Sequence, residues 1–415
     1  MSEHDGDGVV IVGASIGGVM CAETLRAEGY EGPITVLGAE TTTPYNRPPL
    51  SKQVLTGEWT GQEPTITDRE RLASIGVDLL LGVEATSLDT ARRVVTAGGR
   101  EMAYDDVVIA TGVRPRRLPA VARPAGVHEL RTLDDAVALR EEFAALIARG
   151  PARVVVVGSG VLGSELAAAC RSLGADVALV GRTSSLRLGQ VGDRLSSRLA
   201  RLHAAAGVTL VAGADVAAID GTARVEAVRL GSGATLPADL VVVAVGCLPA
   251  VEWLAGSGLH LADGVVCDSS GRAADGVWAV GDVAAWRDDA TGVARRAEHQ
   301  QGAIEQAQAV ARLLATGSAS PRPLPFFWSD LHGTRIQSYG DFAGGGRLVA
   351  VEGDPETDDR FVAESRAADG RVVGVVGWNH PRGFRLARAR VGTRPDNSSV
   401  YPAADLVGAA KGSQS

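Results

Sequence analysis

Glycines occur at two places in the chain with the spacing that lets a backbone approach a phosphate closely. The more complete run is Gly158-Ser-Gly160-Val-Leu-Gly163, which has the pattern G-x-G-x-x-G. It follows a run of valines and opens a helical pattern, and in this context the unpaired N–H groups at a helix start bind a pyrophosphate. Gly158, Gly160 and Gly163 are therefore predicted to contact a dinucleotide.

The other glycine run is Gly13-Ala-Ser15-Ile-Gly-Gly18, with serine where a second glycine is usual. Ser15 adds only a hydroxymethyl group, so Gly13, Ser15 and Gly18 are expected to hold a second dinucleotide, partly through the hydroxyl. Glu40 follows about twenty residues later, where a carboxylate can accept hydrogen bonds from an adenosine ribose. The alternative interpretation of Glu40 is an exposed acid in a turn.

The matching position of the later module carries no carboxylate. Its second strand ends in Gly181-Arg182-Thr183-Ser184. An arginine beside a glycine favours the 2′-phosphate of NADPH, with Thr183 and Ser184 as neutral donors. Alternatively, Arg182 is a solvated surface charge and NADH binds without the acid.

Each glycine run lies inside a strand–helix–strand pattern, so the module is duplicated. The expected elements span 9–13, 15–27 and 34–37, and then 153–158, 161–173 and 176–180. Further apolar runs at 106–110 and 239–244 close the modules, and glycines follow both. After residue 325 the pattern changes to alternating strands. The predicted fold is α/β, with two Rossmann-like dinucleotide-binding domains and a small α+β C-terminal domain.

Composition agrees with this architecture. The 415 residues are 45% hydrophobic but only 4% aromatic, as valine-rich and alanine-rich parallel sheets require. The net charge of −8 and the lack of a long apolar run favour a cytoplasmic protein that binds neither nucleic acid nor membrane. Four scattered cysteines exclude a redox dithiol, and no metal site is predicted.

The predicted domain ranges are 1–115 with 247–320 for the first domain, 116–246 for the second, 321–400 for the third and 401–415 for a flexible tail.

One segment identifies a family. Thr43-Pro-Tyr-Asn-Arg-Pro-Pro-Leu-Ser-Lys52 resembles the P-Y-D-R-P-P-L-S-K signature of the oxygenase-coupled ferredoxin reductases, the putidaredoxin reductase and rubredoxin reductase family. Gly281-Asp282 resembles the second flavin motif of that family. Glu298-His299 resembles the start of its ring-edge helix, and Phe327-Trp-Ser-Asp330 the start of its C-terminal domain. The resemblance extends from about Val9 to about Val391.

The resemblance implies FAD in the first module and NADPH or NADH in the second. The residues implied to contact FAD are Gly13, Ser15, Gly18, Glu40, Arg47, Lys52, Thr111, Gly112, Gly281, Asp282, His299 and Trp328. Asp282 is implied to accept from the ribityl chain, and the helix start near His299 to lie at the N1 and O2 edge of the flavin. Trp328 is implied to pack near the isoalloxazine, although by itself it reads as a core aromatic.

Lys52 and Glu165 are the catalytic residues that the resemblance implies. They are expected to form an ion pair, with Lys52 near flavin N5, while the alternative for Glu165 is an acid favoured by the helix dipole. Related disulfide reductases carry a cysteine just before this lysine, but here Pro48-Pro49-Leu50-Ser51 occupies that stretch. Ala250 and Gln300 depart from the family pattern, which has asparagine and an aromatic residue there.

Three functions remain open at this point. The first is transfer of electrons from NAD(P)H to a small acidic [2Fe-2S] ferredoxin that supplies a monooxygenase such as a cytochrome P450. The second is a flavin reductase or oxidase acting on oxygen or a small molecule, and the third is a redox-gated interaction protein of the apoptosis-inducing-factor type.

The basic run from Arg382 to Arg394 predicts a helix with Arg382, Arg385 and Arg388 on one face, either as a ferredoxin docking strip or as a solvated surface. A monomer or a homodimer is expected.

Overall fold

The computed structural model describes residues 7–60, 64–118, 123–289, 291–320, 324–342 and 347–394. The chain divides into two compact units. The first unit consists of Met1–Ser184 and Gly207–Pro323, and the second of Ser185–Ala206 and Leu324–Ser415. The three domain ranges expected from the sequence stay a prediction. The tail predicted at 401–415 lies outside the described residues.

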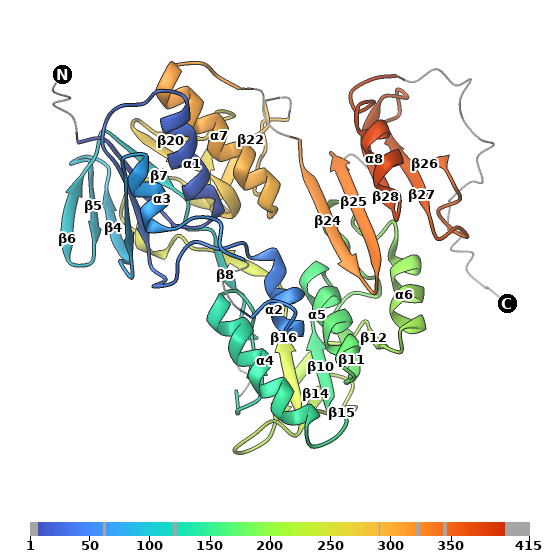
Figure 1. Cartoon of the computed structure of the whole chain (residues 1–415). Helices are drawn as coiled ribbons and strands as arrows, with labels where there is room; N and C mark the ends of the chain where they lie inside the picture. Colours follow the sequence, from blue (N-terminus) through green and yellow to red (C-terminus); the bar gives the residue numbers. More distant parts are fainter. Residues whose placement is uncertain are drawn as a thin grey trace. The chain divides into compact units, whose positions relative to one another are not determined.

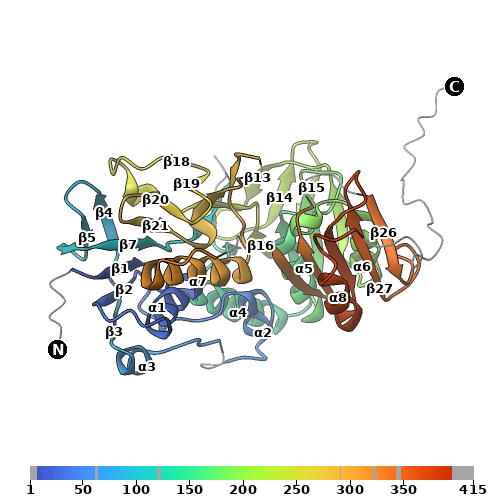
Figure 2. The same cartoon turned by 90° about the horizontal axis from the view of Figure 1, so that it is seen from above.

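The first module of unit 1 is built on a six-stranded sheet with the order β20-β21-β7-β1-β2-β3 (Figure 1). The strands are β1 (Val9–Val12), β2 (Ile34–Gly38), β3 (Val77–Leu81), β7 (Asp106–Ile109), β20 (Arg272–Ala274) and β21 (Val277–Ala279). All neighbours are parallel except β20 and β21. Helices α1 (Ile16–Ala27) and α7 (Gln300–Thr316) lie side by side, as Figures 1 and 2 show.

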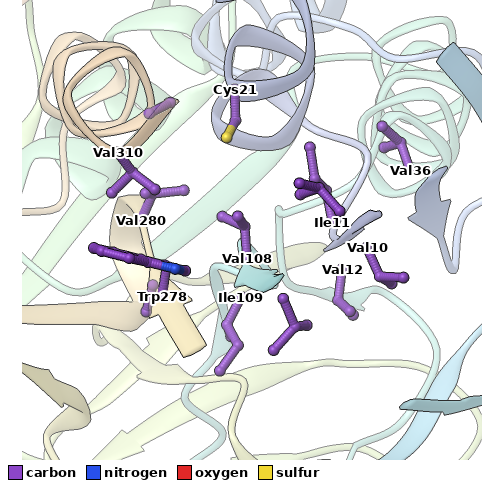
Figure 3. Packing of buried hydrophobic residues seen from close by; sticks show 14 of the residues in the cluster. Val10, Ile11, Val12, Cys21, Val36, Val108, Ile109, Trp278, Val280 and Val310 are labelled. Atoms are coloured by element: carbon purple, nitrogen blue, oxygen red, sulfur yellow. The ribbon is translucent and has the colours of Figure 1, made fainter. Parts of the chain in front are cut away.

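The central strands of this sheet are apolar along their whole length. All four residues of Val9–Val12 are buried, as expected where helices or loops cover both faces of a parallel sheet. Figure 3 shows the side chains of these strands next to Cys21 of α1 and Val310 of α7. Burial of this apolar surface fixes the carboxyl ends of β1 and β7, and the cofactor loops begin there.

The second module of unit 1 has a five-stranded parallel sheet with the order β12-β11-β10-β16-β9. Its strands are β9 (Val127–His128), β10 (Arg153–Val157), β11 (Asp176–Gly181), β12 (Thr209–Ala212) and β16 (Leu240–Val243). Helix α5 (Val161–Ser172) connects β10 to β11, which confirms the second strand–helix–strand unit. Strands β8 (Val113–Pro115) and β17 (Cys247–Pro249) form an antiparallel pair beside the two modules.

Smaller elements complete unit 1. The other helices are α2 (Gln53–Thr56), α3 (Arg69–Ser74) and α4 (Leu133–Ile147). The other strands are β4 (Ala85–Asp89), β5 (Val94–Ala97), β6 (Arg100–Ala103), β13 (Val216–Asp220), β14 (Ala227–Leu230), β15 (Thr235–Pro237), β18 (Leu261–Ala262), β19 (Gly264–Cys267), β22 (Ala284–Arg287) and β23 (Ala294–Arg295).

The described residues of unit 2 form one antiparallel sheet with the order β24-β25-β28-β27-β26 and two α-helices. The elements are α6 (Ser196–Ala205), β24 (Phe326–Leu331), β25 (Thr334–Gly340), β26 (Arg347–Glu352), β27 (Phe361–Arg366), β28 (Val372–Trp378) and α8 (Pro381–Arg388). The strands and α8 agree with the small α+β domain predicted from the sequence. In the part of the chain that is described, no helix is long and apolar enough to cross a membrane.

Candidate dinucleotide and redox site

The first glycine loop joins β1 to α1 and leaves no room for side chains at two of its glycines. Gly13 has a φ of +125°, and a Cβ there would lie 2.2 Å from the carbonyl oxygen of Ala110. A Cβ on Gly18 would lie 1.9 Å from the carbonyl oxygen of Gly13. Ser15 is the N-cap of α1, and its side chain makes no capping hydrogen bond. The helix start is thus held against the ends of β1 and β7 with its first N–H groups available to an anion.

The second loop shows why its three glycines have different roles. An added Cβ would lie 2.1 Å from the Ala244 carbonyl oxygen at Gly158, and 1.7 Å from the Gly158 carbonyl oxygen at Gly163. At Gly160, by contrast, a Cβ would meet no protein atom within 4 Å. Packing therefore requires the outer two glycines, whereas the middle one borders open space at the start of α5. This cradle fits a pyrophosphate that approaches the backbone.

Glu40 is held in place by two side chains of the segment that resembles the family signature. Its Oε1 accepts from Arg47 Nη2 at 2.6 Å, and its Oε2 accepts from the Tyr45 hydroxyl at 2.5 Å. The Tyr45 oxygen also accepts from the backbone N–H of Leu133 at 2.9 Å. Each carboxylate oxygen keeps further acceptor capacity, so the arrangement fits a ribose whose hydroxyls donate to Glu40.

Arg131 is a site residue that the sequence analysis did not identify. Its backbone oxygen accepts from Arg47 Nη1 at 2.6 Å, and its Nη1 lies 3.8 Å from Asp282 Oδ2. Burial, and then the neighbouring charge of Arg47, lower the pKa of Arg131. Two guanidinium groups share this region, and among the described residues Arg131 pairs only with the distant Asp282 carboxylate. The donor set therefore fits a doubly charged pyrophosphate. The available signal was weak: Arg131 directly precedes the capping box formed by Thr132 and Asp135.

Gly281 and Asp282 form a 3₁₀ turn directly after β21. The buried N–H of Gly281 donates to Gln306 Oε1 of α7 at 2.8 Å, and Arg296 Nη1 donates to the backbone oxygen of Asp282 at 2.8 Å. Burial raises the pKa of Asp282. The turn is fixed by its backbone, which leaves the Asp282 carboxylate to face Arg131. A carboxylate in this position can accept from the hydroxyls of a bound ligand.

Lys52 and Glu165 are brought together as predicted from the resemblance. Lys52 Nζ lies 2.7 Å from Glu165 Oε2, and the two side chains are only 16% and 8% exposed. The Ser51 hydroxyl donates to the same carboxylate oxygen at 2.6 Å. Lys52 comes from the start of α2 in the first module, whereas Glu165 lies on α5 of the second. The ion pair therefore joins the two modules within unit 1.

Thr111 and Gly112 follow β7 and contact the backbone of the segment after β17. The Thr111 hydroxyl donates to the carbonyl oxygen of Ala250 at 2.8 Å, and the N–H of Ala250 donates to the Gly112 oxygen at 3.0 Å. Gly112 has a φ of +69°, and a Cβ there would lie 2.9 Å from Arg131 Nη2. Ala250, where the family has asparagine, thus keeps both backbone contacts.

His299 is the N-cap of α7, and burial lowers its pKa. The next residue, Gln300, donates from Nε2 to Asn46 Oδ1 at 2.6 Å. Both members of this amide pair differ from the family pattern, which has an aromatic residue and an aspartate there. The pair ties the signature segment to the first turn of α7.

Two predicted residues lie apart from these contacts. Arg182 is exposed, together with Thr183 and Ser184, directly after β11. Trp328 belongs to unit 2, where it stacks on Phe326 with ring centroids 5.9 Å apart. Its contact with a flavin stays a prediction.

None of the four cysteines, all in the described part, is paired. Cys21, Cys170 and Cys267 are buried, and burial together with Glu298 raises the pKa of Cys247 to about 12. Such a thiol is protonated at neutral pH and is a poor nucleophile. The residue next to Lys52 is Ser51, so no thiol stands beside the buried ion pair. The described residues hold no cluster of three metal-binding side chains.

Comparison with known proteins now assigns the family. The model of the pyridine nucleotide-disulphide oxidoreductases matches residues 7–312, and the reductase C-terminal model matches residues 326–406. The chain belongs to the pyridine nucleotide-disulphide oxidoreductase family. Within it, the resemblance to the oxygenase-coupled ferredoxin reductases is confirmed.

The similar proteins match nearly end to end. The ferredoxin–NAD(+) reductase subunit of the benzene 1,2-dioxygenase system of Pseudomonas putida is 35% identical and covers 92% of both chains. A ferredoxin–NAD(P)(+) reductase of Sphingomonas is 34% identical over 93% of this chain and 94% of its own. The covalent putidaredoxin reductase–putidaredoxin complex gives a TM-score of 0.86 at 30% identity, covering 94% of this chain and 93% of that one. The predicted α/β fold class is confirmed.

Proposed function

We propose that this protein is an FAD-dependent NAD(P)H:ferredoxin reductase that supplies electrons, through a small acidic [2Fe-2S] ferredoxin, to an oxygenase such as a cytochrome P450. The observation that carries the proposal is the Lys52–Glu165 ion pair between two complete dinucleotide modules without a neighbouring thiol. Ferredoxin reductases of dioxygenase systems are among the relatives that match over more than nine tenths of both chains. The cytoplasmic location expected from the sequence stays a prediction.

The residues present fit both cofactors. Gly13, Ser15 and Gly18 would hold the FAD pyrophosphate with Arg131, and Glu40 would accept from the adenosine ribose. FAD bound there would supply hydride acceptance from NAD(P)H and release of electrons one at a time. Asp282 would accept from the ribityl hydroxyls, and its neighbour Gly281 is fixed by Gln306.

The protein's own contribution to hydride transfer is placement. Lys52 and Glu165 hold α2 of the first module against α5 of the second, and α5 begins at the glycine loop for the nicotinamide cofactor. Because the ion pair is largely buried from water, its two side chains have few alternative positions. The pair would therefore align the nicotinamide ring with the flavin ring for hydride transfer and keep the ammonium charge of Lys52 at a fixed position.

The expected NADPH preference rests on the lack of a carboxylate at the end of β11. Gly181 has no room for a side chain, because a Cβ would lie 2.3 Å from Ser159 Oγ. Arg182, Thr183 and Ser184 then offer exposed donors and no acid. A free 2′-phosphate is better matched to these donors than two ribose hydroxyls are.

The decisive experiment is steady-state oxidation of NADPH and NADH by the FAD-loaded protein, with and without a [2Fe-2S] ferredoxin, followed by cytochrome c reduction. We expect cytochrome c reduction to depend strongly on ferredoxin. Fast oxygen consumption that ferredoxin does not change would contradict the proposal and favour an oxidase. Absence of turnover with every acceptor would also contradict it.

A further inference from the structure

The segment Ser185–Ala206, called the strap here, connects two strands of one unit while belonging to the other unit. Strand β11 precedes it and β12 follows it, and these strands are parallel neighbours in the second module of unit 1. The strap itself contacts the C-terminal part of the chain, in unit 2. It begins directly after Arg182–Ser184, the residues that replace a ribose-binding acid.

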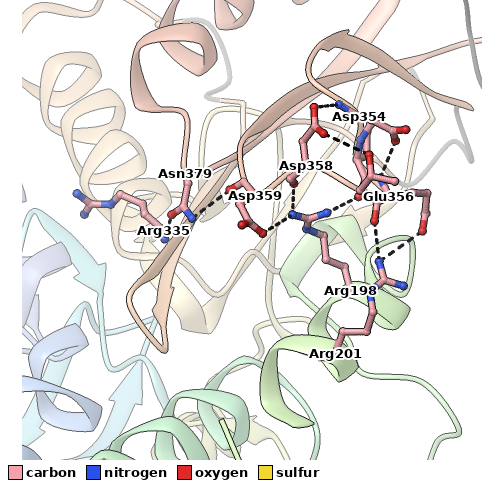
Figure 4. A network of polar contacts seen from close by, with 10 residues as sticks. Arg198, Arg201, Arg335, Asp354, Glu356, Asp358, Asp359 and Asn379 are labelled. Carbon is pink, nitrogen blue, oxygen red and sulfur yellow. Dashed lines mark hydrogen bonds and ion pairs between the residues drawn. The ribbon is translucent and has the colours of Figure 1, made fainter. Parts of the chain in front are cut away.

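Arg198 of α6 is the main anchor of the strap. Its Nη1 donates to the Pro355 carbonyl oxygen at 2.8 Å, and its Nη2 donates to the carbonyl oxygen of Asp358. Figure 4 shows this guanidinium inserted among the residues of the 354–359 loop. The guanidinium carbon also lies 5.1 Å from the ring centroid of Phe361 and 4.8 Å from that of Trp378. A buried arginine that stacks on two rings and donates to two carbonyls has little freedom to move.

Three further side chains hold the strap to unit 2. Arg194 Nη2 donates to the Phe342 oxygen at 2.9 Å, and Arg201 Nη2 donates to the Glu356 oxygen at 3.1 Å. His203 Nδ1 lies 3.1 Å from His332 Nε2. Contacts therefore extend along the strap from before α6 to its last turn, and these contacts make α6 part of unit 2.

The residues directly before the strap are held within unit 1. The N–H of Gly213 donates to the Thr183 oxygen at 3.1 Å, and the N–H of Ala214 donates to the Gly181 oxygen at 2.9 Å. Arg182–Ser184 are thus fixed to β11 and β12 on one side. On the other side, the chain enters the strap after one peptide bond. Along the chain, these exposed donors thus lie between residues held in unit 1 and the strap.

We propose that Arg198 is a positioning residue for the nicotinamide dinucleotide: through the strap it sets the position of the Arg182–Ser184 donors that bind the 2′-phosphate of NADPH. The inference rests on the proposed function in that NADPH binds at this loop. Energetic coupling between two sites is reciprocal, so nucleotide binding must in turn stabilise the strap and its contacts in unit 2.

The first test needs no variant. Hydrogen exchange of the FAD-loaded full-length protein is compared with and without NADP⁺. We expect slower exchange in α6 and in the 353–366 segment of unit 2 when NADP⁺ is bound. Protection restricted to the two glycine loops and residues 181–184 would overturn the inference.

The second test compares Arg198→Met with Arg201→Met. Arg201 lies one turn further along α6 and is a weaker anchor, because its side chain is 56% exposed and contacts Glu356 without stacking on a ring. We expect Arg198→Met to raise the NADP⁺ dissociation constant about tenfold, a typical coupling between sites, and Arg201→Met to leave it within twofold. The rate of flavin reduction at saturating NADPH should stay unchanged in both, which separates positioning from catalysis.

The outcomes distinguish this inference from the proposed function. If the wild-type protein binds neither NADP⁺ nor NAD⁺, the proposed function itself fails. If it binds NADP⁺ and Arg198→Met keeps the wild-type dissociation constant, only the role of Arg198 is refuted. Equal weakening of NADP⁺ binding in Arg198→Met and Arg201→Met would also refute it, because that result would reflect helix charge alone.

Discussion

Lys52 Nζ and Glu165 Oε2 lie 2.7 Å apart in a buried ion pair, and each residue comes from a different dinucleotide module. Replacing Glu165 by alanine leaves an ammonium group without its partner, and we expect the free energy of unfolding to fall by about 3 kcal/mol. Glu165→Gln should cost less, because its amide oxygen can still accept from Ser51 and Lys52. Both variants should slow flavin reduction by NADPH in stopped-flow mixing. A Glu165→Ala protein as stable and as fast as wild type would show that the pair has no role.

The two glycines of the second loop provide a matched comparison. Gly160→Ala places its methyl group in open space, and the extended backbone at φ −85° suits alanine. We expect unchanged thermal stability but an NADP⁺ dissociation constant raised several-fold, because the methyl group occupies the approach of the pyrophosphate. Gly163→Ala would instead drive a Cβ against the Gly158 oxygen and destabilise the protein by about 1–3 kcal/mol. Calorimetric titration and thermal unfolding distinguish the two effects.

Cofactor choice tests the exposed arginine after β11. The wild-type enzyme should show the higher kcat/KM with NADPH, and Arg182→Ala should narrow the gap to NADH by about 1–3 kcal/mol of transition-state binding. Arg187→Ala is a suitable control, since Arg187 is also exposed but lies beyond the loop. An NADH preference that Arg182→Ala does not change would show that Arg182 does not determine the choice of cofactor.

The histidine pair at the end of the strap predicts how stability depends on pH. His203 is fully buried, and burial, then His332, lower its pKa from 6.5 to about 4. The unfolded chain therefore binds a proton between these values while the folded protein does not. Stability should be complete above pH 6.5 and decrease by up to roughly 3 kcal/mol as the pH falls to about 4.

Urea unfolding between pH 7.5 and 4.5 measures this loss. Burial also lowers the pKa values of His332 and His299, so they add to the slope with the same sign. His203→Gln should flatten the profile relative to wild type. An identical pH profile in the variant would place the loss of stability in other groups.

The fold and much of the site could be predicted because the evidence was local. The loops around Gly13 and Gly158 follow buried strands, and their glycine spacing predicts both a tight turn and a dinucleotide ligand. The resemblance supplied the Lys52–Glu165 pair, which the structure confirms.

The missed residues depend on contacts between distant segments. Arg131 contacts Arg47 because the start of α4 packs beside the segment around Tyr45 and Arg47, and no sequence pattern indicates that contact. The strap was equally hidden. Its helix lies inside the range expected for the second module, and its contacts with distant residues, such as that of Arg198 with Pro355, show that it belongs to unit 2.

The basic strip of the C-terminal unit is shorter than its sequence indicates. Helix α8 is present, with Arg382 and Arg385 exposed, as predicted. Arg388 lies 4.0 Å from the ring centroid of Tyr339 and 5.5 Å from that of Phe326. Arg390 pairs with the buried Glu364, so acids distant in sequence neutralise the end of the run. Arg382 and Arg385 therefore remain as the exposed charges, and Leu386 beside them is 67% exposed.

An acidic ferredoxin that docks on α8 would contact two arginines around an exposed leucine. Electrostatic steering should then make the apparent ferredoxin affinity weaken between low salt and about 0.5 M salt, as the charges are screened. Arg382→Glu with Arg385→Glu should raise the ferredoxin KM several-fold while single-turnover flavin reduction by NADPH stays unchanged. The control is Arg371→Glu with Arg394→Glu, which makes the same change in net charge at residues already paired with Asp369. If both double variants raise the KM equally, global charge is responsible, and if neither does, the ferredoxin docks elsewhere.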